Sequence, residues 1–433
     1  MESPWCSFIP QNFLSALANN DSLNADLRES AQETINTGNS LFSNAKASTI
    51  TDDGDGLLSR IQNNEPVGAI EVPHLLDSEM PERKGGLIRL IYNAEGQEVV
   101  PGRNARQVER DFRDRERWSS IWENIAKIYA FFDEQFGHEL FSKERLTVAV
   151  TMNYGHKYMN AHWTGKRVIL GSGDPAFLDD FDKAVDVIAH EITHGVILRT
   201  SGLANFGEPG ALSEHLADVF GLLYKHYEFY PGSNATECTW TIGESLWSPP
   251  DGFFEKYAIG IDPNLSRKFW LAAGGKIADN HSRHYPTKST DVTPEQALTF
   301  KKLPRYLRSF SDPTSTMPAQ PIHIDDYANL KTDNGGVHHN SGIGNYAFYN
   351  AAMDAGGPPL KGVGQIWFRA MTDESLGEKC GFSRFAAFTV AYAARDFGHL
   401  VDSVKRGWEI VGVEPDEVQS IHPRVVVRVR GEL

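Results

Sequence analysis

The stretch that decides the fold is residues 185–198, which read VDVIAHEITHGVIL. Its apolar spacing predicts a helix, and on a helix His190 and His194 lie one turn apart on the same face. Two imidazoles in this position can hold one metal ion, and zinc with three protein ligands lowers the pKa of its water to about 7. Glu191 lies about a quarter turn away, toward such a water, where a carboxylate can accept the water's proton.

A third ligand is expected on the next predicted helix, at about 210–226. Glu214 lies on that helix, and Asp218, one turn farther on, can accept a hydrogen bond from the second ring nitrogen of a ligand histidine. A short motif such as His-Glu-x-x-His also arises by chance, and carboxylates on a helix are ordinarily solvated. The combination of the two histidines with Glu214 nevertheless favours a metal site.

Composition and charge exclude several classes of protein. The chain has 433 residues, with 42 Lys and Arg against 57 Asp and Glu, and a formal net charge of −15. We therefore expect no nucleic-acid partner, because phosphate binding needs clustered Lys and Arg. The longest apolar run, 385–394, is shorter than the ~20 residues of a membrane span, so a buried helix and no membrane partner are expected.

The N-terminus and the cysteines indicate the compartment. Residues 1–27 contain no Lys or Arg, and prolines interrupt their apolar stretch, so a secretory signal is not expected. Three widely spaced cysteines, Cys6, Cys238 and Cys380, imply no disulfide framework. Reduced thiols in a cytoplasmic protein are favoured over a single bridge between the last two. Export by a route that needs no signal is compatible with these features.

The composition changes along the chain and predicts four parts. Residues 1–80 continue from a short apolar opening into a stretch rich in Asn, Ser, Asp and Thr, as expected of a prosegment. Strand patterns characterise residues 81–181, and helical patterns dominate residues 182–413. Residues 414–433 form a C-terminal extension, with an edge strand expected at 425–430.

These parts predict an α+β protein with a β-rich N-terminal lobe, a mainly helical C-terminal lobe and a functional cleft between them. The expected strands are 87–92, 99–100, 146–150 and 168–170. The expected helices are 115–136, 182–199, 210–226, 340–354, 362–371, 382–397 and 400–410.

Three blocks of sequence resemble the thermolysin-like zinc metallopeptidases, and more closely their protealysin-like branch with a short prosegment. The blocks are Asp186–His194 (DVIAHEITH), Gly210–Asp218 (GALSEHLAD) and Asp333–Gly342 (DNGGVHHNSG). The opening Cys6–Leu14 is similar to the start of protealysin-type prosegments, and the resemblance extends from about residue 89 to residue 413. It implies a thermolysin-like two-lobed architecture with a zinc cleft between the lobes.

The resemblance implies a catalytic set. The ligands of one zinc ion would be His190, His194 and Glu214. Glu191 would act as general base and then as proton shuttle. His338, held by Asp333, would donate a hydrogen bond to the oxyanion that develops during the reaction. From the residues alone His338 would be interpreted as a structural histidine, and His339, which matches no catalytic position, keeps that interpretation.

The resemblance also implies substrate-binding residues. Asn160 and Ala161 would pair with the backbone of an extended peptide at an exposed strand edge. Arg308 would bind a substrate carbonyl, and a structural ion pair is the alternative or additional role. The primary pocket would be apolar, so cleavage before a bulky hydrophobic residue is expected. Its residues would be Leu178, Phe181, Val187 and Leu307.

The chain departs from the family pattern at the calcium site. Of the acidic ligands of a double calcium site, only Asp186 and Glu244 are present. The other expected positions carry Lys225, Thr239 and Thr241. Because Ca²⁺ takes six to eight oxygen ligands, calcium binding is doubtful and we expect calcium to contribute little.

Two further departures concern the cleft. Asn205 and Phe206 stand where relatives carry a tyrosine that assists the oxyanion. The connection from Gly243 to Arg308 is unusually long, and its insertion at about 250–300 is interpreted either as a surface subdomain or as a lid that sets specificity.

These observations predict a zinc endopeptidase whose partners are peptide or protein substrates and its own prosegment as inhibitor. Cys6 offers a narrower version, since a thiolate can take the place of the zinc-bound water, although a lone cysteine is more often a small buried hydrophobe. The alternative is a latent or degenerate relative that acts as a zinc-containing binding or regulatory module. Intact Glu191 and His338 favour the enzyme, whereas the missing tyrosine and calcium ligands mildly favour the alternative.

Overall fold

A computed structural model describes most of the chain. The described residues are 6–19, 25–47, 87–108, 112–137, 147–174, 177–246, 306–316 and 319–417. The insertion expected at about 250–300 and the strand expected at 425–430 lie outside these ranges. No helix within the described ranges is long and apolar enough to cross a membrane.

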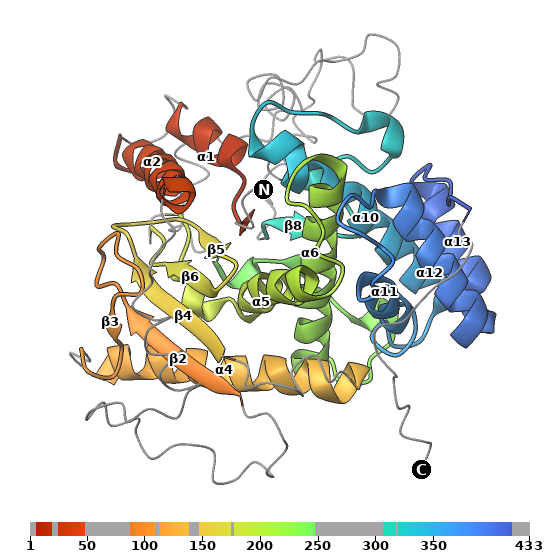
Figure 1. Ribbon diagram of the computed structural model, residues 1–433, viewed down its shortest axis with the longest axis horizontal. Coiled ribbons are helices and arrows are strands. Elements are labelled where there is room, and N and C mark those ends of the chain that lie inside the picture. Colours follow the sequence, from red (N-terminus) through yellow and green to blue (C-terminus); the bar gives the residue numbers. More distant parts are fainter. Residues whose placement is uncertain are drawn as a thin grey trace, which may run out of the picture.

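The N-terminal lobe is built on a six-stranded mixed sheet with the order β1-β5-β6-β4-β2-β3 (Figure 1). Neighbours β2, β4 and β6 run parallel, and the outer pairs are antiparallel. The strands are β1 (Cys6–Ser7), β2 (Ile88–Asn93), β3 (Arg103–Asn104), β4 (Thr147–Tyr154), β5 (Ala161–Trp163) and β6 (Arg167–Gly171).

One expected strand is wrong. Val99 and Val100 are 48% and 40% exposed and belong to no strand, and Arg103–Asn104 pairs with β2 instead. Two adjacent valines favour a strand locally, but Pro101 follows them and has no N–H to donate to a ladder. The strands expected at 87–92, 146–150 and 168–170 are confirmed, as β2, β4 and β6.

Helix α4 (Phe112–Phe136) covers the sheet and joins it to the second lobe (Figure 1). Its buried side chains Ile121, Ile125, Ile128 and Phe132 recur every three or four residues, which is the pattern that predicted the helix. The aromatic end of α4 packs on the second lobe, since the Phe136 and Phe368 rings are stacked with centroids 4.1 Å apart.

The C-terminal lobe is mainly helical, as predicted, and each of its six expected helices is present. They are α5 (Val185–Arg199), α6 (Gly207–Phe229), α10 (Asp333–Ala355), α11 (Val363–Met371), α12 (Phe382–Asp396) and α13 (Val401–Ile410). Glycines let three of these helices approach closely: a Cβ at Gly221 of α6 would lie 2.6 Å from the Asp186 carbonyl oxygen of α5. A Cβ at Gly344 of α10 would lie 2.5 Å from the His215 ring of α6.

A two-stranded sheet borders the space between the lobes. Strand β7 (Thr241–Ile242) pairs antiparallel with β8 (Arg308–Ser309). This pairing fixes Arg308 beside α6. Cys238 and Cys380 are not bonded to one another in the structure.

The N-terminal segment folds onto the rest of the molecule through α1 (Gln11–Ala18) and α2 (Ala25–Ala47). The apolar residues Leu27, Ala31 and Ile35 recur every four positions of α2 and are buried. Polar contacts fix the same helix: Ser30 Oγ lies 2.8 Å from Asp174 Oδ2, and Thr34 Oγ1 accepts the Met159 N–H at 3.1 Å. Residues 48–86 lie outside the described ranges.

Candidate active site

Three buried side chains from α5 and α6 converge between the lobes. One donor atom each of His190, His194 and Glu214 lies within 4.8 Å of the others. The two Nε2 atoms are 3.1 Å apart, and the Glu214 oxygens lie 3.5 Å from His190 Nε2 and 3.4 Å from His194 Nε2. Tetrahedral zinc with bonds of about 2.0–2.1 Å separates its ligand atoms by about 3.3 Å. The set therefore fits zinc in both chemistry and spacing.

Asp218 orients the first of these ligands. Its Oδ1 lies 3.0 Å from His190 Nδ1, so the other ring nitrogen faces the cluster. Arg308 donates to the same carboxylate, and Asn345 Nδ2 donates to its Oδ2 at 2.9 Å. Although burial opposes the charged form, Arg308 and His190 hold the pKa of Asp218 below its usual value.

Glu191 is fully buried beside the cluster. Within the described part of the chain, neither of its carboxylate oxygens has a hydrogen-bond partner. Burial raises the pKa of this carboxyl to about 8, although the nearby His190 opposes the shift. A buried carboxylate without partners is costly, so Glu191 fits a site that receives water and a cation.

His338 reaches the cluster from the start of α10. Asp333, Asn334, Gly335 and Gly336 have positive φ angles, and this turn places the Asp333 carboxylate against His338 Nδ1. Oδ2 of Asp333 also accepts the backbone N–H of His338 at 3.1 Å. Burial opposes protonation, but Asp333 and Glu214 together raise the pKa of His338. The Nε2 atom lies 3.2 Å from Glu214 Oε2 and faces the cluster.

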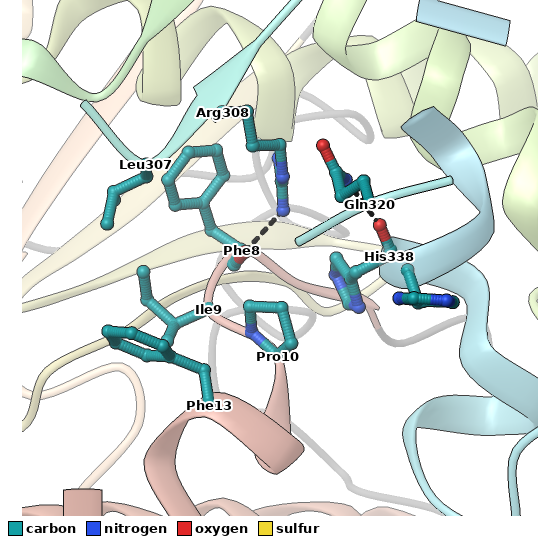
Figure 2. A pocket seen from close by; sticks show the side chains of 9 residues that line it. Phe8, Ile9, Pro10, Phe13, Leu307, Arg308, Gln320 and His338 are labelled. Carbon is teal, nitrogen blue, oxygen red and sulfur yellow. Dashed lines mark hydrogen bonds between the residues drawn. The ribbon is translucent and has the colours of Figure 1, made fainter. Parts of the chain in front are cut away.

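The N-terminal segment lies in the cleft over these residues. His338 Nε2 contacts the carbonyl oxygen of Ser7. Figure 2 shows the next contact, in which Arg308 donates to the carbonyl oxygen of Phe8. The N–H of Phe8 donates to the carbonyl oxygen of Ala161 at 2.9 Å.

Asn160 holds the next residue of the segment. Its Oδ1 accepts the Ile9 N–H at 2.6 Å, and its Nδ2 donates to the Ile9 carbonyl oxygen at 3.0 Å. Both contacts are buried side-chain contacts to backbone groups, so they do not depend on the identity of residue 9. Asn160 and Ala161 thus contact an extended peptide backbone, here that of the N-terminal segment.

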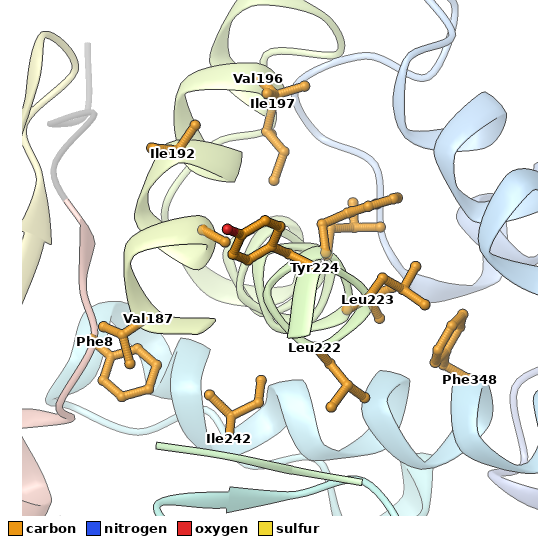
Figure 3. Packing of buried hydrophobic residues seen from close by; sticks show 14 of the residues in the cluster. Phe8, Val187, Ile192, Val196, Ile197, Leu222, Leu223, Tyr224, Ile242 and Phe348 are labelled. Carbon is orange, nitrogen blue, oxygen red and sulfur yellow. The ribbon is translucent and has the colours of Figure 1, made fainter. Parts of the chain in front are cut away.

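The Phe8 side chain fills an apolar pocket and is 1% exposed. Its ring packs edge-on against His190 with centroids 5.1 Å apart, and the Arg308 guanidinium lies 4.3 Å from the ring centroid. Leu307 lines the pocket together with the ring (Figure 2), and Val187 is buried in the same hydrophobic cluster (Figure 3). The remaining expected pocket residues, Leu178 and Phe181, are buried in the same hydrophobic cluster.

Sequence reasoning missed two polar residues that support the site. Gln320 Nε2 donates to the His338 carbonyl oxygen at 2.6 Å and to Ser341 Oγ at 3.2 Å. Asn345 links Asp218 to His215, whose Nδ1 lies 2.9 Å from its Oδ1. Asn345 follows His338 by two helical turns and so shares its face, a signal that the sequence did contain.

Comparison with known proteins places this geometry in a family. Residues 82–198 match the family described as thermolysin metallopeptidase, catalytic domain, and residues 201–253 and 279–413 match thermolysin metallopeptidase, alpha-helical domain. The chain belongs to the thermolysin metallopeptidases. It is therefore a zinc metalloendopeptidase, and His190, His194 and Glu214 are the residues present that fit the metal.

Comparisons with individual proteins support the same family. An extracellular metalloprotease of Pectobacterium carotovorum subsp. carotovorum is 33% identical over 327 residues, which are 75% of this chain and 81% of the relative. Protease PrtS of Photorhabdus sp. (strain Az29) is 32% identical over 338 residues, 76% of this chain and 78% of the relative. The structure of the precursor of protealysin from Serratia proteamaculans aligns with a TM-score of 0.64 and 27% identity, covering 94% of this chain and 99% of that one. The protealysin-type resemblance is thereby confirmed.

Proposed function

We propose that this peptidase cleaves peptide bonds on the amino side of bulky hydrophobic residues and that its own N-terminal segment inhibits it. The observation that carries both parts is the position of Phe8. Its ring is buried in the apolar pocket, while its backbone is held by Ala161 and Arg308. A substrate and the N-terminal segment would therefore compete for the same contacts.

The residues around the cluster supply the chemistry of hydrolysis. Zinc, when bound, supplies a Lewis acid that polarises the scissile carbonyl and lowers the pKa of water. Glu191 accepts the proton of the attacking water and passes it to the leaving amine, a role open to a buried carboxylate beside the metal ligands whose oxygens have no partner among the described residues. His338 donates through Nε2 to the oxygen on which negative charge develops, and Asp333 holds its ring.

The pocket supports a hydrophobic preference. Burying a large apolar side chain stabilises the bound state by roughly 1.5–3 kcal/mol relative to leaving it in water. Val187 and Leu307 are apolar, and the nearby cation Arg308 is already engaged by Asp218, so a charged side chain would gain little in this pocket. Cleavage of a peptide library should thus return Phe, Leu or similar residues after the cut, and charged residues at that position would contradict the proposal.

The inhibition is supported by contacts of the described residues of the N-terminal segment. Ser7, Phe8 and Ile9 lie in the cleft, and α1 and α2 pack beside it. The side chain of Cys6 lies outside what the structure describes, so its expected contact with zinc stays a prediction.

A precursor that is cut after folding tests the inhibition. A recognition site for a sequence-specific protease is introduced between residues 47 and 87, and peptide hydrolysis is measured before the cut and after removal of the released segment. We expect a large rise in activity, while Cys6→Ser without the cut changes little. Activation by Cys6→Ser alone would indicate ligation by that thiol.

Two other outcomes are informative. If the uncut chain is as active as the cut one, the N-terminal segment is structural and not inhibitory. If the zinc-loaded chain remains inactive after the cut, it is the latent relative instead.

A further inference from the structure

The peptide bond between Ser7 and Phe8 is held as a scissile bond would be. We propose that this bond is a self-cleavage site, which the folded precursor hydrolyses while the remainder of the N-terminal segment stays bound. The inference rests on the proposed function, since it assigns a reaction to the same cleft. It names a covalent modification of the chain and the point at which it occurs.

The register identifies the bond. His338, the residue placed to stabilise an oxyanion, contacts the carbonyl oxygen of Ser7 and not that of Phe8. The next carbonyl along the chain, that of Phe8, accepts from Arg308. The carbonyl carbon that water would attack therefore belongs to Ser7, and the nitrogen that would leave belongs to Phe8.

The strand pairing fixes this register independently. Strand β1 pairs antiparallel with β5, with Cys6 opposite Trp163 and Ser7 opposite His162. The pairing continues through the Phe8 N–H, which donates to the carbonyl oxygen of Ala161. A slip by one residue would turn the Phe8 side chain out of its pocket, because successive side chains of a strand point to opposite faces.

The residue that follows the proposed bond matches the hydrophobic preference that we propose for the pocket. Phe8 is a bulky hydrophobic residue on the amine side of the bond, and it is buried against His190. The contact with His338, the register of β1 and the identity of residue 8 thus indicate the same bond. Three separate observations place the same bond at the catalytic residues.

The reaction consumes one water molecule. The water oxygen joins the carbonyl carbon of Ser7, and the bond between that carbon and the Phe8 nitrogen breaks. Ser7 becomes the carboxyl end of a heptapeptide, residues 1–7, and the Phe8 nitrogen takes up a proton to become a free amine. Glu191 carries that proton from the water to the nitrogen.

Contacts on the far side of the bond do not depend on residues 1–7. Asn160 still holds both backbone groups of Ile9, and Arg308 still donates to the Phe8 carbonyl oxygen. The buried residues of α1 and α2 continue to anchor the segment. The cut is therefore distinct from release of the N-terminal segment, which needs a second event.

The experiment follows the N-terminus of the purified, zinc-loaded full chain. After incubation, intact mass and N-terminal sequencing should show loss of residues 1–7 and a new terminus at Phe8. Phe8→Leu is the matched control and should be cut at the same bond. Phe8→Asp should be cut at least about tenfold more slowly, because a charge replaces the apolar side chain in the pocket. Glu191→Gln should keep its original terminus.

Dilution shows whether each chain cuts itself. The bond lies in its own cleft, so the fraction cut at a fixed time should stay constant over a tenfold dilution. A tenfold fall would mean that one chain cuts another and would overturn the proposal. Equal cutting of Glu191→Gln would overturn it too, since a different protease would then be responsible.

Hydrolysis of a separate peptide distinguishes a failure of this inference from a failure of the proposed function. Each variant also carries the protease site between residues 47 and 87, and a short peptide with a Ser–Phe bond is offered after removal of the N-terminal segment. If this peptide is hydrolysed but the Ser7–Phe8 bond of the uncut chain stays intact, the inference is wrong and the proposed function stands. If neither is hydrolysed, both are wrong. Hydrolysis of the peptide by Phe8→Asp also shows that this variant has folded.

Discussion

The Nζ atom of Lys225 lies 2.6 Å from Oε2 of Glu244. The same ammonium lies 3.1 Å from the carbonyl oxygen of Thr241 and 3.7 Å from Oδ2 of Asp186. A cation that belongs to the chain is thus fixed between the two carboxylates that the sequence assigned to an eroded calcium site. Burial opposes the charged form of Glu244, but Lys225 and Thr241 together hold its pKa below the usual value.

We therefore predict that calcium stabilises this protein little. Millimolar calcium should change the melting temperature by no more than a few degrees, because Lys225 already provides the positive charge. Lys225→Ala should destabilise by about 1 kcal/mol, since it removes a largely buried ammonium from Asp186 and Glu244, although water partly solvates the Glu244 carboxylate. Lys127→Ala, which removes a more exposed lysine from its pair with Glu228, should cost less, about 0.5 kcal/mol. A rise of ten degrees or more with calcium would refute the prediction.

Asp218 should tune the affinity for zinc without binding it. Asp218→Asn removes the charge that orients His190, so the zinc dissociation constant should rise roughly 10–100-fold in a chelator competition. Asp373→Asn is the matched control, because Asp373 is equally buried but contacts Tyr392 and Ser375 instead. Equal zinc affinity for both variants would show that Asp218 serves only packing.

Asn160 should contribute to substrate affinity more than to the chemical step. Its two hydrogen bonds to a peptide backbone are worth about 0.5–1.5 kcal/mol each. After removal of the N-terminal segment, Asn160→Ala should lower kcat/KM roughly 5–150-fold, mostly through a higher KM. A fall in kcat with KM unchanged would mean that Asn160 contacts the peptide only in the transition state.

His226 should make the folded state sensitive to acid. Burial lowers its pKa to about 4, with a further contribution from Lys225, whereas an unfolded chain takes up the proton near pH 6.5. Between these values the unfolded state binds more protons, so stability falls as the pH falls, by up to about 1.4 kcal/mol per pH unit. Urea unfolding at pH 7 and pH 5 should show a shallower loss for His226→Gln than for the wild type.

The exposed His399 provides the control for this pH series. His399→Gln should lose stability between pH 7 and pH 5 as the wild type does. Zinc release in acid affects all three proteins, so the difference between their slopes is the quantity to compare. If stability falls equally with pH in His226→Gln and in the wild type, His226 is not the group responsible for the sensitivity to acid.

Short-range patterns were sufficient for the metal site and most of the fold. His190 and His194 share one helical turn, and Glu214 follows in the next helix, so spacing alone indicated their association. The helices of the second lobe were predicted to within a few residues at most ends, because each buries a stripe of apolar side chains. The start of α10 differs more, since Asp333–Gly336 form a turn of positive φ before the regular helix.

Long-range contacts could not be read from the sequence in the same way. Helix α2 has a polar composition, and besides its few apolar residues it is held by Ser30, which contacts Asp174, and Thr34, which contacts the backbone of Met159. Phe8 meets Arg308 across 300 positions of the chain, which no local periodicity encodes. The polar supports Gln320 and Asn345 likewise act through partners in other elements.

The central claim, that Glu191 performs the proton transfers of a zinc peptidase, is tested most directly by Glu191→Gln. The measurement is zinc content together with the rate of peptide hydrolysis, after the N-terminal segment has been cut away and removed. We predict that the variant keeps one zinc per chain while its rate falls by about 10²–10⁴-fold, because the amide cannot accept the proton of the attacking water. Hydrolysis at a rate near that of the wild type, with zinc bound, would contradict the account.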